Sequence, residues 1–77
     1  MIDYRPFITA DPGVCHGKPC FRGTRVMVSA VLEMLAAGAT TREIGEAYPR
    51  VTKKSIEAAL FFAAQSLEHT QFHYLKH

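Results

Sequence analysis

The chain has 77 residues, near the lower limit at which one hydrophobic core sustains a fold, so residues 1–77 form a single expected domain. Hydrophobic residues make up 48% and charged residues 21% with a formal net charge of +2, which excludes a disordered tail and does not by itself indicate a nucleic-acid partner. The longest apolar stretch, residues 58–64, is far below the roughly 20 residues of a membrane span, and with no signal peptide visible we expect a cytoplasmic protein without a membrane segment.

Residues 1–28 are expected to form a β-hairpin segment. Short extended pieces alternate there with turn residues, and Arg22-Gly23-Thr24 between two β-favouring stretches is typical of a hairpin turn. Side chains from Arg25 to Val28 alternate as in a half-buried strand. An isolated hairpin is marginal in water, so it should pack on helices or pair with another copy.

Residues 29–77 are expected to form the helical part. Ser29 is the predicted N-cap of a first helix that Gly38 ends, with an apolar stripe of Val31, Leu32 and Leu35. A second helix begins at the capping box Thr40-Thr41-Arg42-Glu43 and ends at Pro49. Its predicted inward residues are Ile44, Ala47 and Tyr48.

The third predicted helix is the longest. Thr52 is its expected N-cap, and Val51 and Ile56 have the spacing of a hydrophobic staple. The residues expected on its buried face are Ile56, Ala59, Leu60, Ala63 and Leu67. With the short turn 49–51 before it, this pair of helices has the proportions of a helix-turn-helix. The sequence thus predicts a mainly α fold, an N-terminal β-hairpin followed by a three-helix, homeodomain-like bundle.

Basic residues around the predicted helix-turn-helix indicate a DNA-binding face. They are Arg42 in the second helix, Arg50 in the turn, and Lys53 and Lys54 in the first turn of the third helix. Positive charge at a helix N-terminus opposes the macrodipole unless an anion such as a phosphate compensates. The alternative is that both lysines are solvated surface residues.

The hairpin segment carries a second group of cations. The stretch between Asp11 and Glu33 contains no acidic residue. Its basic residues are Lys18, Arg22 and Arg25. These side chains would contact a groove or phosphates as a wing or arm does. Alternatively, Arg22 or Arg25 pairs with Asp11 or with a helix acid.

The third helix offers few side chains suited to base readout. It carries a second apolar patch instead, which continues beyond the helix: Ala58, Phe61, Phe62, Phe72 and Tyr74. A chain this small has little protein to cover such a patch, so we expect a homodimer or partner interface. Core burial under the N-terminal segment is the alternative.

Chemistry-bearing residues are few. Cys15 and Cys20 are expected to be free thiols in a reducing cytosol. Together with His16 they could begin a zinc site, but a second pair of ligands would have to come from the C-terminal histidines His69, His73 and His77. No cofactor or metal is therefore expected. No paired carboxylates, phosphate loop or Ser/His/Asp set is visible, so the chain is not expected to be an enzyme.

Residues 8–28, which contain Gly17-Lys18-Pro19 and Gly23-Thr24-Arg25, resemble the signature of the domain-of-unknown-function family 433. The resemblance extends over about residues 7–65, through Leu35-Ala36-Ala37-Gly38, Glu43-Ile44, Tyr48-Pro49 and Ile56-Glu57-Ala58-Ala59-Leu60. Two departures are His16, where a glycine is usual, and Lys53-Lys54, where acidic residues are common after the Thr52 cap.

The resemblance implies a prokaryotic helix-turn-helix protein similar to the antitoxins of type II toxin-antitoxin systems. Such a protein would bind double-stranded DNA at its own promoter and neutralise a toxin with a PIN-like nuclease fold. The short stretch 66–77 leaves open a plain transcriptional regulator or a dimeric protein-interaction module. A neighbouring gene for a small PIN-like nuclease would favour the antitoxin.

Overall fold

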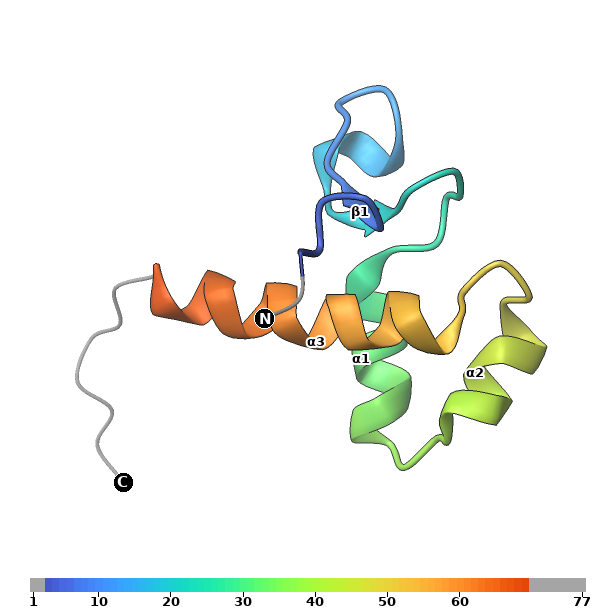
Figure 1. The fold of residues 1–77 in the computed structure, drawn as a ribbon. Helices are drawn as coiled ribbons and strands as arrows, with labels where there is room; N and C mark the ends of the chain where they lie inside the picture. The colour runs from blue at the N-terminus through green and yellow to red at the C-terminus, as the bar shows by residue number, and fades with distance from the viewer. Residues whose placement is uncertain (1–2, 70–77) are drawn as a thin grey trace.

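The computed structural model describes residues 3–69 (Figure 1). Along the chain come β1 (Ile8–Thr9), a 3₁₀ turn (Cys15–Gly17), β2 (Cys20–Phe21), α1 (Val28–Ala36), α2 (Thr41–Ala47) and α3 (Lys53–Glu68). The predicted mainly α fold, an N-terminal β-hairpin followed by three helices, is therefore confirmed. Within the described residues, no helix is long and apolar enough to cross a membrane.

The hairpin pairs different strands from those predicted. β1 runs antiparallel to β2, with Ile8 opposite Phe21 and Thr9 opposite Cys20. The stretch after Gly23 is not the regular strand expected from the sequence, although it does pair with β2: Cys20 and Met27 form one bridge, and the Phe21 amide donates to the Val26 carbonyl at 2.9 Å. Thr24 is the physical reason: its hydroxyl donates to the Phe21 carbonyl at 2.7 Å and accepts from the Val26 amide at 3.0 Å. These local bonds favour a turn over a longer ladder.

The first helix begins one residue before its predicted cap. Met27 keeps extended dihedrals (φ −72°, ψ 140°) and is the N-cap, so Ser29 lies inside α1 and the prediction for it is wrong. The pairing of Met27 with Cys20 holds that residue extended, and the helix starts directly after it. The end of α1 is as predicted, because Gly38, just past the Ala37 cap, has a φ of +94°.

The capping box of α2 is confirmed. The Glu43 amide donates to Thr40 Oγ1 at 3.1 Å, and the Thr40 amide donates to Glu43 Oε1 at 2.9 Å. Hydrogen bonding to Thr40 lowers the pKa of Glu43, chiefly through the Thr40 backbone and to a smaller extent through its side chain. Ile44 is fully buried and Tyr48 half-buried, as expected, whereas Ala47 is exposed. Ala47 lies at the edge of the stripe in the last helical turn, where no element covers it.

The start of α3 is also as predicted, because the Ser55 amide donates to Thr52 Oγ1 at 3.1 Å. The predicted buried face is wrong beyond Ala59, since Leu60 is 50% and Leu67 62% exposed. The buried residues of α3 are Ser55, Ile56, Ala58 and Ala59. The cause is tertiary: the second half of α3 projects past the other elements in Figure 1, so only its first half lies over the core.

One core joins both strands and all three helices. Ile8 and Phe21 from the sheet pack with residues of the helices and of the α2–α3 turn: Val28, Val31, Ile44, Val51, Ile56 and Ala59. Val51 and Ile56, the predicted staple pair, belong to this cluster. The N-terminal hairpin is thereby fixed on α1 and α3, next to the helix-turn-helix.

Candidate nucleic-acid interface

Two turns that are far apart in sequence meet beside a cavity of about 560 Å³. One is the Gly23 turn after β2, and the other is the α2–α3 turn. Arg50 of the α2–α3 turn donates from Nη1 to the Gly23 carbonyl at 2.9 Å, which ties the two turns together. Three arginines line this cavity, together with Asp11 and Thr9 among others: Arg22, Arg25 and Arg50.

A second hollow of about 300 Å³ lies directly between the two turns. Its lining includes Thr24, Arg25 and Val26 on one side and residues 47–50 on the other. Arg25 and Arg50 border both hollows. The two depressions therefore form one continuous surface, which we call the arginine face: Arg22, Arg25 and Arg50.

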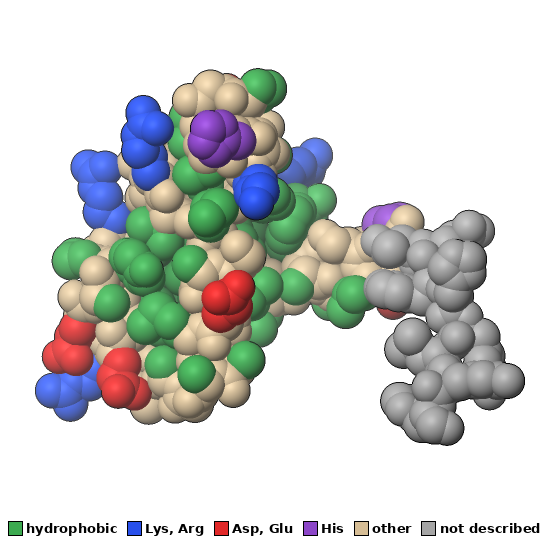
Figure 2. All heavy atoms as spheres, turned by 180° about the vertical axis from the view of Figure 1, so that it is seen from behind, with side chains coloured by type: hydrophobic (Ala, Val, Ile, Leu, Met, Phe, Trp, Pro, Cys, Tyr) green, Lys and Arg blue, Asp and Glu red, His purple; other side chains and the backbone are tan. Residues whose placement is uncertain are grey.

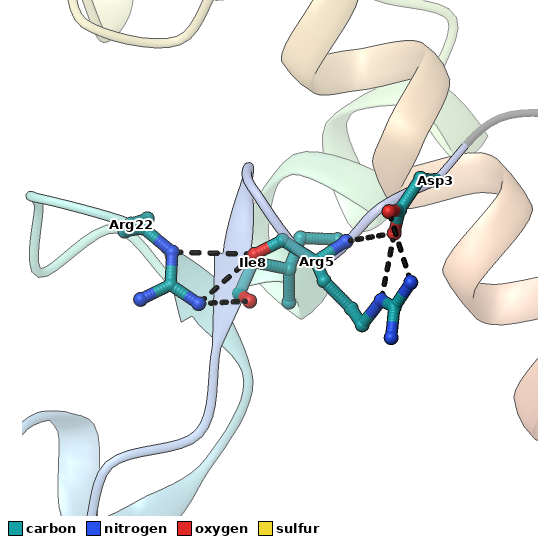
Figure 3. A network of polar contacts seen from close by, with 4 residues as sticks. All are labelled: Asp3, Arg5, Ile8 and Arg22. Atoms are coloured by element: carbon teal, nitrogen blue, oxygen red, sulfur yellow. Dashed lines mark hydrogen bonds and ion pairs between the residues drawn. The ribbon is translucent and has the colours of Figure 1, made fainter.

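Arg22 is held in place by backbone carbonyls (Figure 3). Its Nε and Nη2 donate to the Arg5 carbonyl at 3.2 and 2.9 Å, and Nη2 also donates to the Ile8 carbonyl at 3.3 Å. The alternative of an ion pair with Asp11 is not what the structure shows. These bonds join the segment before β1 to the residue after β2, and they leave Nη1 of Arg22 pointing outward in Figure 3.

The remaining predicted cations differ in whether an acidic residue lies close to them. Arg42 lies 3.9 Å from Glu46, so part of its charge is compensated within α2. Within residues 3–69 the other ion pair is Arg5 with Asp3, and no acid pairs with the arginine face or with Lys18, Lys53 and Lys54. Figure 2 shows Lys and Arg side chains gathered mainly over the upper, N-terminal part of that view, with acidic ones below.

Lys53 and Lys54 are exposed in the first turn of α3, a few residues after Arg50. No acidic residue stands in that turn. The amides at a helix N-terminus already favour anions, and two lysines strengthen this preference. Lys18 is different: it lines an apolar groove on another part of the molecule and does not join the arginine face.

That groove has a volume of about 520 Å³ and lies between α1 and the second half of α3. Among its lining residues are Leu32 of α1 and Phe62, Ala63 and Leu67 of α3. Leu60 and Leu67, on the second half of α3, stay largely exposed in the described part of the chain.

The predicted interface patch is only partly where the sequence placed it. Ala58 is fully buried in the core, so its inclusion was wrong: the face of α3 that carries it turns inward. Phe61 and Phe62 are half-buried and pack against Tyr4. The centroid of the Tyr4 ring lies 6.4 Å from that of Phe61 and 5.0 Å from that of Phe62. The alternative of burial under the N-terminal segment thus accounts for part of their surface. The remaining two members lie outside the described residues: Phe72 and Tyr74.

The two cysteines are free and lie behind the Gly23 turn. Cys15 donates from Sγ to the Arg25 carbonyl at 3.3 Å, and Cys20 donates to the Thr24 carbonyl at 3.7 Å. Among residues 3–69, no three His, Cys, Asp or Glu side chains come together as a metal site would need. His73 and His77 fall outside the described range.

The sequence identified all these cations but not the hydrogen bonds to backbone carbonyls that hold Arg22 and Arg50 in place. The Arg22 and Arg50 side chains bind carbonyls, which every residue carries, so no sequence pattern marks their partners. The meeting of the two turns is a tertiary contact between positions 23 and 50, which no local pattern of the sequence marks.

Comparisons with known proteins agree with this fold. The family model described as "Protein of unknown function (DUF433)" matches residues 8–63. The chain is similar to the uncharacterized protein y4eO of Sinorhizobium fredii, 36% identical over 59 residues, which covers 77% of this chain and 27% of that protein. It therefore spans about a quarter of that relative's length. The crystal structure of a DUF433 member protein from Anabaena variabilis superposes with a TM-score of 0.75 at 31% identity, over 83% of this chain and 63% of that one.

Proposed function

Because this chain belongs to the DUF433 family of proteins of unknown function, we propose a function from its own surface: it binds double-stranded DNA through phosphate contacts. The arginine face carries this proposal. Three arginines of two different turns converge on one cavity, and no acid within residues 3–69 pairs with any of them. Asp11 is the one carboxylate among the described residues that line the cavity, so three cations share it with a single anion and keep an excess of positive charge that a bound anion would compensate.

The chemistry of the face suits phosphates in particular. A guanidinium presents planar, parallel N–H donors that match two oxygens of one phosphate. Arg50 is fixed by its bond to the Gly23 carbonyl, so less side-chain freedom is lost when it binds. Lys53 and Lys54 follow Arg50 within four positions and add two exposed cations to this part of the chain.

Phosphate contact, more than base readout, is the expected mode. Base edges are read by Arg, Asn or Gln side chains in the major groove. The outer face of α3 beyond its first turn presents exposed apolar residues instead: Leu60, Ala64 and Leu67. Affinity should thus depend strongly on salt and weakly on sequence, with selectivity supplied by DNA shape.

Lys53→Glu combined with Lys54→Glu tests the role of this helix end. If both lysines meet phosphates, the variant should bind all DNA sequences more weakly, and the slope of log affinity against log salt should flatten by about one unit per lost contact. Fluorescence anisotropy with a labelled duplex at several salt concentrations measures both quantities.

Lys18→Glu is the matched control, because Lys18 is exposed and unpaired but lines the apolar groove instead of the arginine face. It changes the net charge in the same direction and should shift affinity only slightly. An unchanged slope in the double variant would remove the α3 end from the interface. The double variant changes the net charge twice as much, so a loss for Lys18→Glu of about half that size in log affinity would show a response to net charge alone.

The wider role that we propose is that of an antitoxin-like regulator in the cytoplasm, which binds its own promoter and a protein partner. Support for a protein partner comes from the apolar groove of about 520 Å³ and the exposed Leu60 and Leu67. A second copy of the chain is the first occupant to expect, and a PIN-like nuclease toxin is the one implied by family resemblance. A dimeric interaction module without DNA binding is the alternative that the groove favours.

Sedimentation at micromolar concentration should show a homodimer, and Leu60→Asp with Leu67→Asp should convert it to a monomer. Both side chains are largely exposed within the chain, so the variant should keep its helical circular dichroism. A wild-type protein that sediments as a monomer at all concentrations would contradict self-association and leave the groove for a different protein.

A further inference from the structure

Two thiols lie behind the turn that carries the arginine face. Cys15 and Cys20 donate to the carbonyls of Arg25 and Thr24, which are adjacent in the chain. Both sulfurs therefore rest on the same short piece of backbone, although they come from the 3₁₀ turn and from β2. Burial raises the pKa of the Cys20 thiol, and the neighbouring Cys15 side chain raises it further.

The backbone around Cys15 is held in an uncommon conformation. Cys15 and His16 have φ values of +52° and +56°, a left-handed region that non-glycine residues seldom occupy. Such strain persists only where the surrounding structure holds it, and it is concentrated at functional positions. Here it places the half-buried Cys15 thiol over the Gly23 turn, while Cys20 is fully buried beneath.

We propose that Cys15 and Cys20 form a reversible disulfide site that a hydroperoxide oxidises, and that the bond loosens the arginine-bearing turn. Disulfides in cytosolic proteins are characteristically transient and redox-sensing. The difference in burial assigns the order of events: Cys15, the more accessible thiol, reacts first, and Cys20 resolves the product.

The reaction balances with the hydroperoxide as its oxidant. The Cys15 sulfur attacks the peroxide O–O bond, takes one oxygen as a sulfenic acid and releases an alcohol, or water if the oxidant is hydrogen peroxide. The Cys20 sulfur then attacks the Cys15 sulfur. The S–S bond forms, the S–O bond breaks, and the departing hydroxide takes the Cys20 proton as water. The two thiols together lose two electrons, which the peroxide gains.

The consequence for the turn follows from the hydrogen bonds. A disulfide has no S–H donors, so the carbonyls of Thr24 and Arg25 lose their sulfur partners. These residues are next to Gly23, whose carbonyl accepts from Arg50. Oxidation should thus free the segment that carries Arg25 and that adjoins the carbonyl which holds Arg50. The expectation that oxidation lowers DNA affinity rests on the proposed function. The disulfide and the loosened turn do not depend on it.

The disulfide itself is tested on the full chain with a small excess of hydrogen peroxide. The expected product is a single chain lighter by two hydrogen atoms, with both thiols blocked to iodoacetamide, and dithiothreitol should restore them. Cys15→Ser is the control and should form no intrachain bond. A treated wild type that keeps both thiols, gains oxygen atoms only, or links two chains overturns the site.

Limited trypsin digestion then tests the turn without any DNA. Cleavage after Arg25 should become several-fold faster in the oxidised wild type, because two weak S–H hydrogen bonds to this segment are lost and local opening becomes easier. DNA affinity should fall by a similar factor. Unchanged cleavage overturns the loosening, and faster cleavage with unchanged affinity overturns its link to DNA. If the reduced protein binds no DNA, the proposed function fails while the disulfide and digestion results still decide this inference.

Discussion

Replacing Gly23 by valine is expected to lower the free energy of unfolding by roughly 1–3 kcal/mol. Gly23 has a φ of +79° in a turn closed by the Thr24 amide donating to the Phe21 carbonyl at 3.0 Å. A β-branched residue fits this left-handed conformation poorly. Apart from its neighbours in the chain, no atom lies within 4 Å of a Cβ built at Gly23, so the expected cost is that of the backbone conformation.

Gly45→Ala is the matched control. Gly45 lies inside α2, and its added Cβ would approach the Val51 carbonyl oxygen at 3.9 Å, an ordinary contact. Alanine is favoured over glycine in a helix by about 1 kcal/mol, so this variant should be as stable as the wild type or more so. Urea unfolding followed by circular dichroism compares the three proteins. A Gly23→Val protein with wild-type stability would show that the turn does not need positive φ.

The features that the sequence predicted well are local ones. The Thr40–Glu43 capping box, the Thr52 cap and the stop at Gly38 each depend on residues within four positions of one another. Their hydrogen bonds form wherever those residues stand at a helix end. The order of the elements and the fold class follow from these signals and from hydrophobic spacing.

The failures concern contacts between distant residues. The regular partner of β2 is Ile8–Thr9, across the 3₁₀ turn, whereas the residues after Gly23 add only a bridge at Met27; local β-preference does not distinguish these partners. The apolar residues of α3 are spread over more than one face of the helix, so hydrophobic spacing alone did not decide which face is buried. The core covers the face with Ala58 and Ala59, and Leu60 and Leu67 remain outside.

The candidate site shows the same division. Every cation of the arginine face was named from the sequence, but as members of two separate groups, one in the hairpin and one in the helix-turn-helix. Arg50 bonds to Gly23 across 27 positions, and this contact is what makes the groups one surface. Its acceptor is a backbone carbonyl, so neither charge nor residue type marks the pairing in advance.

The double variant Arg25→Glu, Arg50→Glu is expected to weaken DNA binding by roughly a hundredfold or more at low salt, with a loss that shrinks as salt rises. Two cations that border both hollows become anions, so phosphate attraction is lost and repulsion is added at the centre of the proposed interface. Anisotropy with a labelled duplex, over a range of salt concentrations, measures the effect.

Arg50 also braces the Gly23 turn, so the single variants separate charge from structure. Arg25 makes no side-chain hydrogen bond within the described residues, and Arg25→Glu should weaken binding while the melting temperature stays unchanged. Arg42→Glu is the charge-matched control for Arg25→Glu, because Arg42 already faces Glu46 and lies apart from the arginine face. Equal binding by Arg25→Glu and Arg42→Glu would contradict the assignment of the arginine face, since the loss would then follow net charge and not the position of Arg25 between the two turns.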